Sequence, residues 1–147
     1  MLTVVEKVIL LQNVDVFSEV PSEQLTYLAS IAEEVDCLKG DILFRENDPA
    51  DALYLVLDGN VSLERGGKEV KQAGSQIAFG TWALIDDASR VVTATVKENA
   101  RLLKIDRRKF VDLLADNVQV TQGVLKTLVK RIHDIMKKLG VENRESA

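Results

Sequence analysis

The sequence predicts a mainly β fold with helices at both ends. Apolar residues recur at helical spacing in residues 1–35 and 106–140, whereas residues 36–105 contain short β-type runs separated by turn residues. A length of 147 residues suits one compact domain and is too short for two ordinary ones. We therefore expect a single α+β domain with two N-terminal helices, a sandwich or roll of about eight strands, two C-terminal helices, and a tail at residues 141–147.

Two helices are expected before the first strand. The first has one apolar face, formed by Val4, Val5, Val8, Ile9 and Leu11. It ends before Phe17, because Asn13 and Asp15 favour a turn. Pro21-Ser22-Glu23 then provides a helix start, and apolar residues at helical spacing continue the second helix to about Val35.

Turn residues divide the central region into strands. Asp58-Gly59 is expected to join a strand at 53–57 to one at 60–64, and Gly66-Gly67 is expected to reverse the chain again. Both pairs suit hairpin loops that need positive φ angles. Asn47-Asp48-Pro49 is expected to form an ordered turn, because asparagine tolerates the left-handed conformation and proline fixes its own φ.

Two helices are expected after Ile105. Asp106 is a good N-cap for the shorter one, which carries Phe110 on its apolar face, and a break at Asp116-Asn117 starts the longer one. The longer helix has apolar residues at alternating spacings of three and four, namely Leu125, Leu128, Ile132, Ile135 and Leu139. This spacing is typical of a coiled-coil seam and favours a homodimer through the last helix; the alternative is a helix packed against its own domain.

The segments Phe79-Gly80-Thr81-Trp82-Ala83-Leu84 and Ser89-Arg90-Val91-Val92-Thr93 have the features of an anion site. A glycine lets the backbone approach a ligand closely, and a helical turn after it would direct N–H groups at negative charge. Arg90 would complete the site, because its planar guanidinium suits a phosphate better than a lysine does. The alternative is a surface loop in which Arg90 pairs with Asp86 or Asp87.

The order of residues along the chain resembles that of the cyclic nucleotide-binding domain family. The resemblance runs from about Val5 to the last helix and is carried by Gly40, Asp51, Leu53-Tyr54, Gly59-Asn60-Val61, Phe79-Gly80, Ala83-Leu84, Arg90, Thr93 and Ile105-Asp106-Arg107. Within this family, the sequence is similar to the effector domains of catabolite activator-type regulators and to the regulatory subunits of cyclic-AMP-dependent kinase. The resemblance implies an antiparallel jelly roll, or double-stranded β-helix, with cAMP or cGMP as the candidate ligand, and raises the expectation of a dimer through the last helix.

The candidate ligand-binding residues that follow from the resemblance are Phe79, Gly80, Thr81, Trp82, Ala83, Arg90, Val91 and Thr93. Arg90 would hold the phosphate together with the backbone N–H groups of Thr81 and Trp82. Thr93 would line the floor of the pocket, and Trp82 would either pack into the core or stack on the base.

Thr81 departs from the family pattern, because it stands where the family has a ribose-binding glutamate. A carboxylate makes a charge-assisted hydrogen bond of about 1.5–3 kcal/mol, whereas a threonine hydroxyl makes a weaker, neutral one. We therefore expect the affinity for cyclic nucleotides to be about ten- to a hundredfold below that of an intact site.

Two functions are compatible with these residues. The first is a regulatory module that senses a cyclic nucleotide or a related phosphorylated small molecule and signals through its C-terminal helix. The alternative is an interaction or dimerisation module that keeps the fold and binds no ligand. Loss of the glutamate favours the alternative, and retention of Arg90 and Thr93 favours sensing.

Other features of the chain predict what it does not do. Apolar runs such as 53–57 are far shorter than the ~20 residues of a spanning helix, and the N-terminus lacks a secretory signal, so we expect a cytoplasmic protein with no membrane segment. A net charge of −4, and only eight residues after Leu139, predict no direct DNA binding and a separate output protein. The single histidine, His133, cannot form a multi-histidine metal site, and no Walker-type loop is present. We expect no enzymatic activity, no metal and no cofactor.

Overall fold

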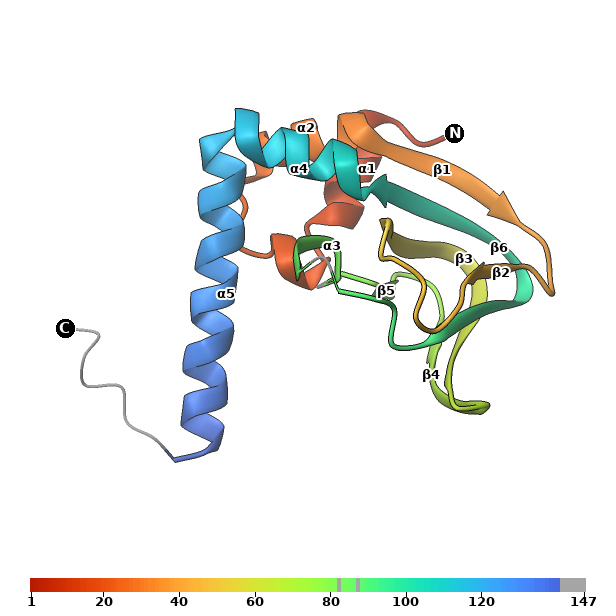
Figure 1. Cartoon of the computed structure of the whole chain (residues 1–147). Coiled ribbons are helices and arrows are strands. Elements are labelled where there is room, and N and C mark those ends of the chain that lie inside the picture. The colour runs from red at the N-terminus through yellow and green to blue at the C-terminus, as the bar shows by residue number, and fades with distance from the viewer. Residues whose placement is uncertain (82, 87, 141–147) are drawn as a thin grey trace.

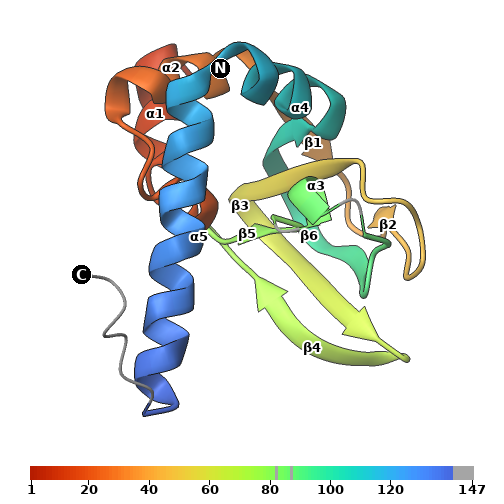
Figure 2. The same cartoon turned by 60° about the vertical axis from the view of Figure 1, so that its left-hand side comes forward.

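A computed structural model describes residues 1–81, 83–86 and 88–140, which form a curved β-sheet with helices before and after it (Figure 1). The elements in chain order are α1 (Val4–Leu11), η1 (Asp15–Phe17), α2 (Ser22–Ile31), β1 (Ala32–Cys37), β2 (Ile42–Phe44), β3 (Ala52–Arg65), β4 (Lys68–Ala73), β5 (Ala78–Phe79), α3 (Ala83–Asp86), β6 (Thr93–Asp106), α4 (Arg107–Asp116) and α5 (Val118–Lys138). The N-terminal helices and the C-terminal helices lie together at one end of the strands (Figures 1 and 2). The predicted class, mainly β with flanking helices, is confirmed.

Two long strands, β3 and β6, organise the sheet. The order is β1-β6-β3-β4, β2 pairs with β6, and β5 pairs with β3. All of these pairs are antiparallel. The pairing of β3 with β6 runs from Ala52↔Asp106 to Glu64↔Thr93, so these two strands connect the helical end of the molecule to the far end of the roll.

The predicted hairpin at Asp58-Gly59 is wrong, because β3 continues through it with register shifts against β6. Gly59 has a φ of +98°, and a Cβ at this position would lie 2.6 Å from the carbonyl oxygen of Asn99 on β6. The glycine therefore serves a bulge where two strands approach closely, and not a chain reversal. Since β3 and β6 are each continuous, the described residues form six strands and not the expected eight or so.

The second helix ends at Ile31, so the helix boundary expected near Val35 is wrong. β1 begins at Ala32 and pairs with β6 over its whole length, from Ala32↔Ile105 to Cys37↔Ala100. Pairing with a distant strand supplies the backbone hydrogen bonds of this segment. Tertiary context thus overrides the local helical spacing.

Several turns and caps lie where the sequence predicts them. Gly66 and Gly67 have φ angles of +59° and +80° and form the tight hairpin between β3 and β4. Asn47 has a φ of +72°. The side chains of Asp106 and Asn117 accept backbone N–H groups in the first turns of α4 and α5, which satisfies donors that would otherwise be unpaired.

Alternation along the strands divides the apolar core in two. Leu53 and Leu55 of β3 pack against the helices, in a cluster that contains Phe17 and Phe110 with ring centroids 5.9 Å apart. Tyr54, between them, belongs to a second cluster within the roll. Because successive side chains point to opposite faces, the same strand contacts both clusters.

The last helix, α5, has a buried face and an exposed apolar stripe. Its buried residues are Val120, Gly123, Val124 and Thr127. The exposed stripe consists of Leu125, Val129, Ile132, Ile135 and Leu139, each 51–74% exposed. The C-terminal half of α5 extends beyond the rest of the molecule (Figures 1 and 2). Within the described part of the chain, no helix combines the length and apolar character needed to span a membrane.

Candidate functional site

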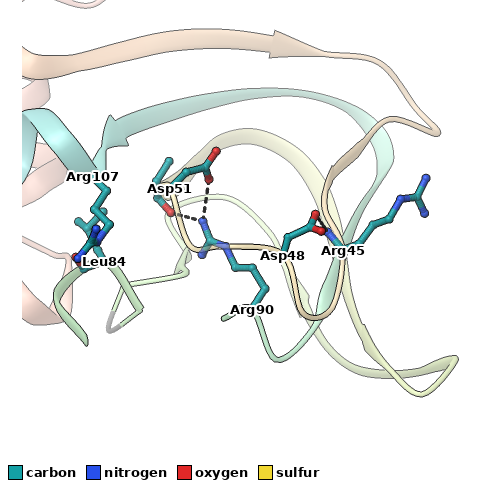
Figure 3. Close-up of polar contacts among 7 residues, drawn as sticks. Arg45, Asp48, Asp51, Leu84, Arg90 and Arg107 are labelled. Atoms are coloured by element: carbon teal, nitrogen blue, oxygen red, sulfur yellow. Dashed lines mark hydrogen bonds and ion pairs between the residues drawn. The ribbon is translucent and has the colours of Figure 1, made fainter. Parts of the chain in front are cut away.

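Arg90 is almost completely buried, and part of its guanidinium has no partner. Its side chain is 2% exposed. Nη2 donates to the carbonyl oxygen of Ala52 at 2.5 Å and to Oδ1 of Asp51 at 3.3 Å (Figure 3). Nε and Nη1 find no hydrogen-bond acceptor among the described residues. Unpaired donors on a buried charged group cost free energy. An anion that accepts these N–H groups would remove that cost.

The turn at Arg45–Asp48, which contains Asn47, fixes the backbone of Arg90. The N–H of Arg90 donates to the carbonyl of Asp48, and its own carbonyl accepts from Asn47, both at 2.8 Å. Phe44, at the end of β2, precedes this turn, and its ring centroid lies 4.0 Å from Cζ of Arg90. The residues that hold Arg90 therefore come from a segment distant in sequence.

Gly80 brings the backbone against the guanidinium. Its φ of +75° is in the left-handed region, and a Cβ there would collide with Nη1 of Arg90. The same Cβ would lie 3.2 Å from the carbonyl oxygen of Ala52. The position therefore requires glycine both for its backbone conformation and for its space.

A cavity of about 320 Å³ opens beside Arg90. Its described lining residues are Phe44, Leu63, Phe79, Gly80, Thr81, Asp86, Ala88, Ser89, Arg90, Val91 and Val92. Most of this lining is apolar, with a few polar groups around the guanidinium, as is common in small-molecule sites.

Five of the predicted site residues line this cavity together: Phe79, Gly80, Thr81, Arg90 and Val91. Their assignment as ligand contacts remains a prediction. Trp82 lies outside the described residues, as does the side chain of Ala83.

Thr93 is placed differently from the prediction. It is not among the described lining residues, and its hydroxyl accepts the N–H of Glu46 at 3.1 Å. Thr93 thus ties the start of β6 to the turn that holds Arg90.

The alternative in which Arg90 pairs with Asp86 or Asp87 differs from the ion pair in the structure, which joins Arg90 to Asp51. Asp86 lines the cavity and makes no ion pair with a described residue, while Asp87 lies outside the described residues. Asp51 directly precedes Ala52 in the chain, and Nη2 of Arg90 donates to the carbonyl oxygen of Ala52. The carboxylate of Asp51 is therefore within reach of the same nitrogen.

Sequence reasoning missed Phe44 and Leu63 as lining residues. Phe44 faces Arg90 because β2 pairs with β6 with Phe44 opposite Ala94, and Leu63 also lies opposite Ala94, on β3. These contacts depend on long-range register, which no local motif encodes.

Two other titratable groups near the roll are held neutral. Burial, with a further contribution from the charge of Asp51, raises the pKa of the Tyr54 phenol. Burial likewise raises the pKa of the Cys37 thiol, which packs in the apolar cluster within the roll. No three metal-ligating side chains cluster in the part of the chain that the structure describes.

The site is connected to the C-terminal helices through Arg107, the first residue of α4. Its Nε donates to the carbonyl oxygen of Leu84 in α3 at 3.1 Å (Figure 3). Its backbone N–H donates to the carbonyl of Asp51 at 2.8 Å. Leu84 itself is fully buried in the cluster that contains Phe110 of α4. A displacement of α3 would therefore act directly on α4.

The fold is that of a known domain family. A family model for the cyclic nucleotide-binding domain matches residues 34–117, more than half of the chain. The chain belongs to the cyclic nucleotide-binding domain family, and the resemblance seen in the sequence is confirmed.

Individual relatives agree with this assignment. The CRP-like cAMP-activated global transcriptional regulator of Mycobacterium tuberculosis is 24% identical over 128 residues, covering 84% of this chain and 57% of the regulator. A cAMP-dependent protein kinase regulatory subunit of Dictyostelium discoideum is 27% identical over 113 residues, covering 71% of this chain and 33% of the subunit. Among solved structures, the N-terminal domain of a transcriptional regulator from Streptomyces coelicolor A3(2) matches with a TM-score of 0.80 and 27% identity, covering 91% of this chain and 98% of that domain.

The structural match confirms the jelly-roll fold. The chain spans 57% and 33% of the length of the two curated relatives described. Because one of them is a transcriptional regulator, the expectation that this chain does not bind DNA stays a prediction. The expected cytoplasmic location and the expected lack of enzymatic activity stay predictions as well.

Proposed function

We propose that this chain is a ligand-sensing regulatory module whose ligand is a cyclic nucleotide or a related phosphorylated small molecule. The observation that carries the proposal is the buried guanidinium of Arg90, with Nε and Nη1 unpaired among the described residues beside a cavity of about 320 Å³. Relatives described as cAMP-activated or cAMP-dependent support cAMP, and with it cGMP, as the candidate ligand.

A phosphate in the cavity would accept the Nε–H and Nη1–H groups that the described residues leave unpaired. Each hydrogen bond to a charged group contributes about 1.5–3 kcal/mol. Nη2 can keep its bonds to Ala52 and Asp51 meanwhile, so the guanidinium is held in place before the ligand arrives. Such preorganisation lowers the entropic cost of binding.

The remaining contacts of a cyclic nucleotide would be weaker than in a site with a carboxylate. Thr81 lines the cavity and would offer a neutral hydroxyl to the ribose, in the place of the family's glutamate. Leu63, Val91 and Val92 would contact the apolar faces of the ligand. The proposed affinity is therefore about ten- to a hundredfold below that of an intact site.

The proposed signal passes from α3 to the C-terminal helices. Arg107 and Leu84 connect α3 to α4, and α4 leads into α5 with only Asn117 between them. A ligand that moves α3 would thereby bias the position of α5. The size of the bias cannot exceed the difference in ligand affinity between the two positions.

The proposed output is a homodimer through α5, read by a separate protein. Its apolar stripe (Leu125, Val129, Ile132, Ile135 and Leu139) is exposed, unlike the residues Val120, Gly123, Val124 and Thr127 that α5 buries against the domain. A contiguous apolar stripe of this kind marks an interaction surface. Sedimentation of the wild type and of Ile132→Glu tests the dimer, which the charge should dissociate; a monomeric wild type would contradict it.

The rival function, a ligand-free interaction module, is favoured by one observation. Arg90 is already bonded internally to Ala52 and Asp51, so the fold holds it without a ligand. In that case Nε and Nη1 would be donors that the packing of Arg90 leaves unpaired among the described residues, and they would have no role in ligand binding.

Isothermal titration of protein refolded from denaturant distinguishes the two functions, because refolding removes copurified nucleotide. We expect cAMP or cGMP to bind with micromolar or tighter affinity, and linear AMP to bind more weakly. No binding of either cyclic nucleotide up to millimolar concentration would overturn cyclic nucleotides as the signal. Inorganic phosphate, titrated next, would show whether the anion site works at all.

A further inference from the structure

We infer that Phe44 is a positioning residue for the ligand, because its ring holds the Arg90 guanidinium in the orientation that leaves Nε and Nη1 open to the cavity. This inference rests on the proposed function, since it concerns the same cavity. The ring centroid of Phe44 lies 4.0 Å from Cζ of Arg90, well within the ~6 Å range of a cation–π contact. Both residues line the cavity, and Phe44 is 5% exposed.

The hydrogen bonds of the guanidinium anchor it at one end, at Nη2, and do not involve Nε or Nη1. Both hydrogen bonds are made by one nitrogen, Nη2, and the one to Asp51 involves a side chain that is 69% exposed. An ion pair with so exposed a partner is weak. The backbone of Gly80 lies close to Nη1 but accepts no hydrogen bond from it. Among the contacts of the described residues, the aromatic face of Phe44 is the one placed to define the plane of the guanidinium.

Phe44 can do this because its own ring is fixed. Its centroid lies 6.0 Å from that of Tyr54 and 6.0 Å from that of Phe79. Tyr54 and Phe79 are stacked in turn, with centroids 5.4 Å apart and an interplanar angle of 17°. The three rings come from β2, β3 and β5, so Phe44 cannot rotate without repacking the roll. Phe79 directly precedes Gly80, so the same cluster of rings positions the backbone of Gly80 as well as the ring of Phe44 beside Arg90.

Fluorinated phenylalanines at position 44 test this role with little change in volume. Fluorine withdraws electron density from the ring face, so a series from one to three fluorine atoms weakens a cation–π contact stepwise. We expect the dissociation constant for cAMP or cGMP to rise with each fluorine, by about two- to thirtyfold in total. The matched control is the same series at Phe110, which packs against Phe17 and does not line the cavity.

Unfolding measured on the same proteins separates the possible outcomes. A rise in the dissociation constant at position 44, with no rise at position 110, supports the inference. If affinity stays constant while the unfolding midpoint falls stepwise, the ring is structural only and the inference is overturned. If both stay constant, the contact has no energetic role and the inference is also overturned. If the wild type binds neither the nucleotides nor inorganic phosphate, the proposed function itself fails, and the positioning role fails with it.

Discussion

The cavity beside Arg90 and the contact between α5 and the N-terminal segment both bury polar groups, but they treat them differently. At the α5 contact, Thr127 is 3% exposed; its hydroxyl accepts the N–H of Glu19 at 3.3 Å and donates to the carbonyl of Gly123 at 3.0 Å. In the cavity, Nε and Nη1 of Arg90 have no partner among the described residues. Native structures rarely leave buried polar groups unpaired. The polar groups at the α5 contact are therefore paired, whereas the described residues leave two donors in the cavity without an acceptor.

Ion pairs extend the α5 contact along the helix. Arg131 pairs with Asp15 at 2.5 Å, and Lys130 pairs with Glu19 at 3.5 Å. These four side chains are at least 36% exposed, so the pairs contribute little stability. The close approach of the backbones at Gly123 is the stronger determinant of where α5 lies.

Removing the charge from the cavity should have the largest effect. We expect Arg90→Ala to weaken binding of cAMP or cGMP by about a hundredfold or more, because the phosphate loses its charged partner. The unfolding free energy should change by less than about 1 kcal/mol, because the unpaired donors leave with the side chain. Titration calorimetry and denaturant unfolding measure the two quantities.

Arg101→Ala is the matched control, because Arg101 is 51% exposed and pairs with Asp36 on the outside of the sheet. It should leave affinity unchanged. The opposite pattern for Arg90→Ala, in which stability falls by several kcal/mol while any binding persists, would show that Arg90 serves the fold and not the ligand.

Adding one methyl group at the α5 contact should have the next largest effect. A Cβ on Gly123 would lie 2.7 Å from Cα of Val20, so Gly123→Ala must push α5 away from the N-terminal segment. We expect a net loss of about 1–2 kcal/mol, since overpacking costs more than alanine's helix propensity returns.

Gly74→Ala provides the comparison, because a Cβ at Gly74 meets no atom within 4 Å. This variant should be neutral or slightly more stable. Equal midpoints of thermal unfolding for the two variants would show that α5 is not held at Gly123 in solution.

Restoring the family's carboxylate should have a smaller effect, an increase in the affinity of the cavity for its ligand. We expect Thr81→Glu to improve affinity for cAMP or cGMP about tenfold, because a charge-assisted hydrogen bond to the ribose replaces a neutral one. Thr81→Gln has nearly the same shape without the charge and should improve affinity less. Equal affinities for the two variants would contradict a ribose contact at this position.

The smallest expected effect concerns pH. The pKa of Tyr54 is raised in the folded state, chiefly by burial, so the folded protein holds this proton more tightly than the unfolded chain. Stability from this group is therefore complete below the ordinary tyrosine pKa of about 10 and is lost as pH rises above it. Tyr54→Phe should show a shallower fall in unfolding free energy between pH 9 and pH 11. Parallel curves for the two proteins would contradict the raised pKa.

The sequence predicted those parts of the structure that depend on neighbouring residues. The cap at Asp106, the break at Asp116-Asn117 and the hairpin at Gly66-Gly67 are local features, and all are present. The errors at Val35 and Asp58-Gly59 share one cause, since both segments are decided by pairing with β6, far along the chain.

The same division holds for the site. Gly80 and Arg90 could be found from a short motif, because both belong to the loop that precedes β6. Phe44 and Asp51 could not, because they reach Arg90 only through the fold of β2, β3 and the turn between them. The distinction between a paired and an unpaired guanidinium also needed the structure, since the sequence left a choice between a ligand and an internal carboxylate.

The most direct test of the central claim is to observe the Nε–H group of Arg90 by nitrogen-15 NMR while cAMP is added, with the resonance assigned by its loss in Arg90→Lys. The account predicts a saturable change in the chemical shift of this resonance and slower exchange of its proton with water, because the phosphate becomes its acceptor. An Nε–H resonance that stays unchanged while the protein becomes saturated with ligand would contradict the account.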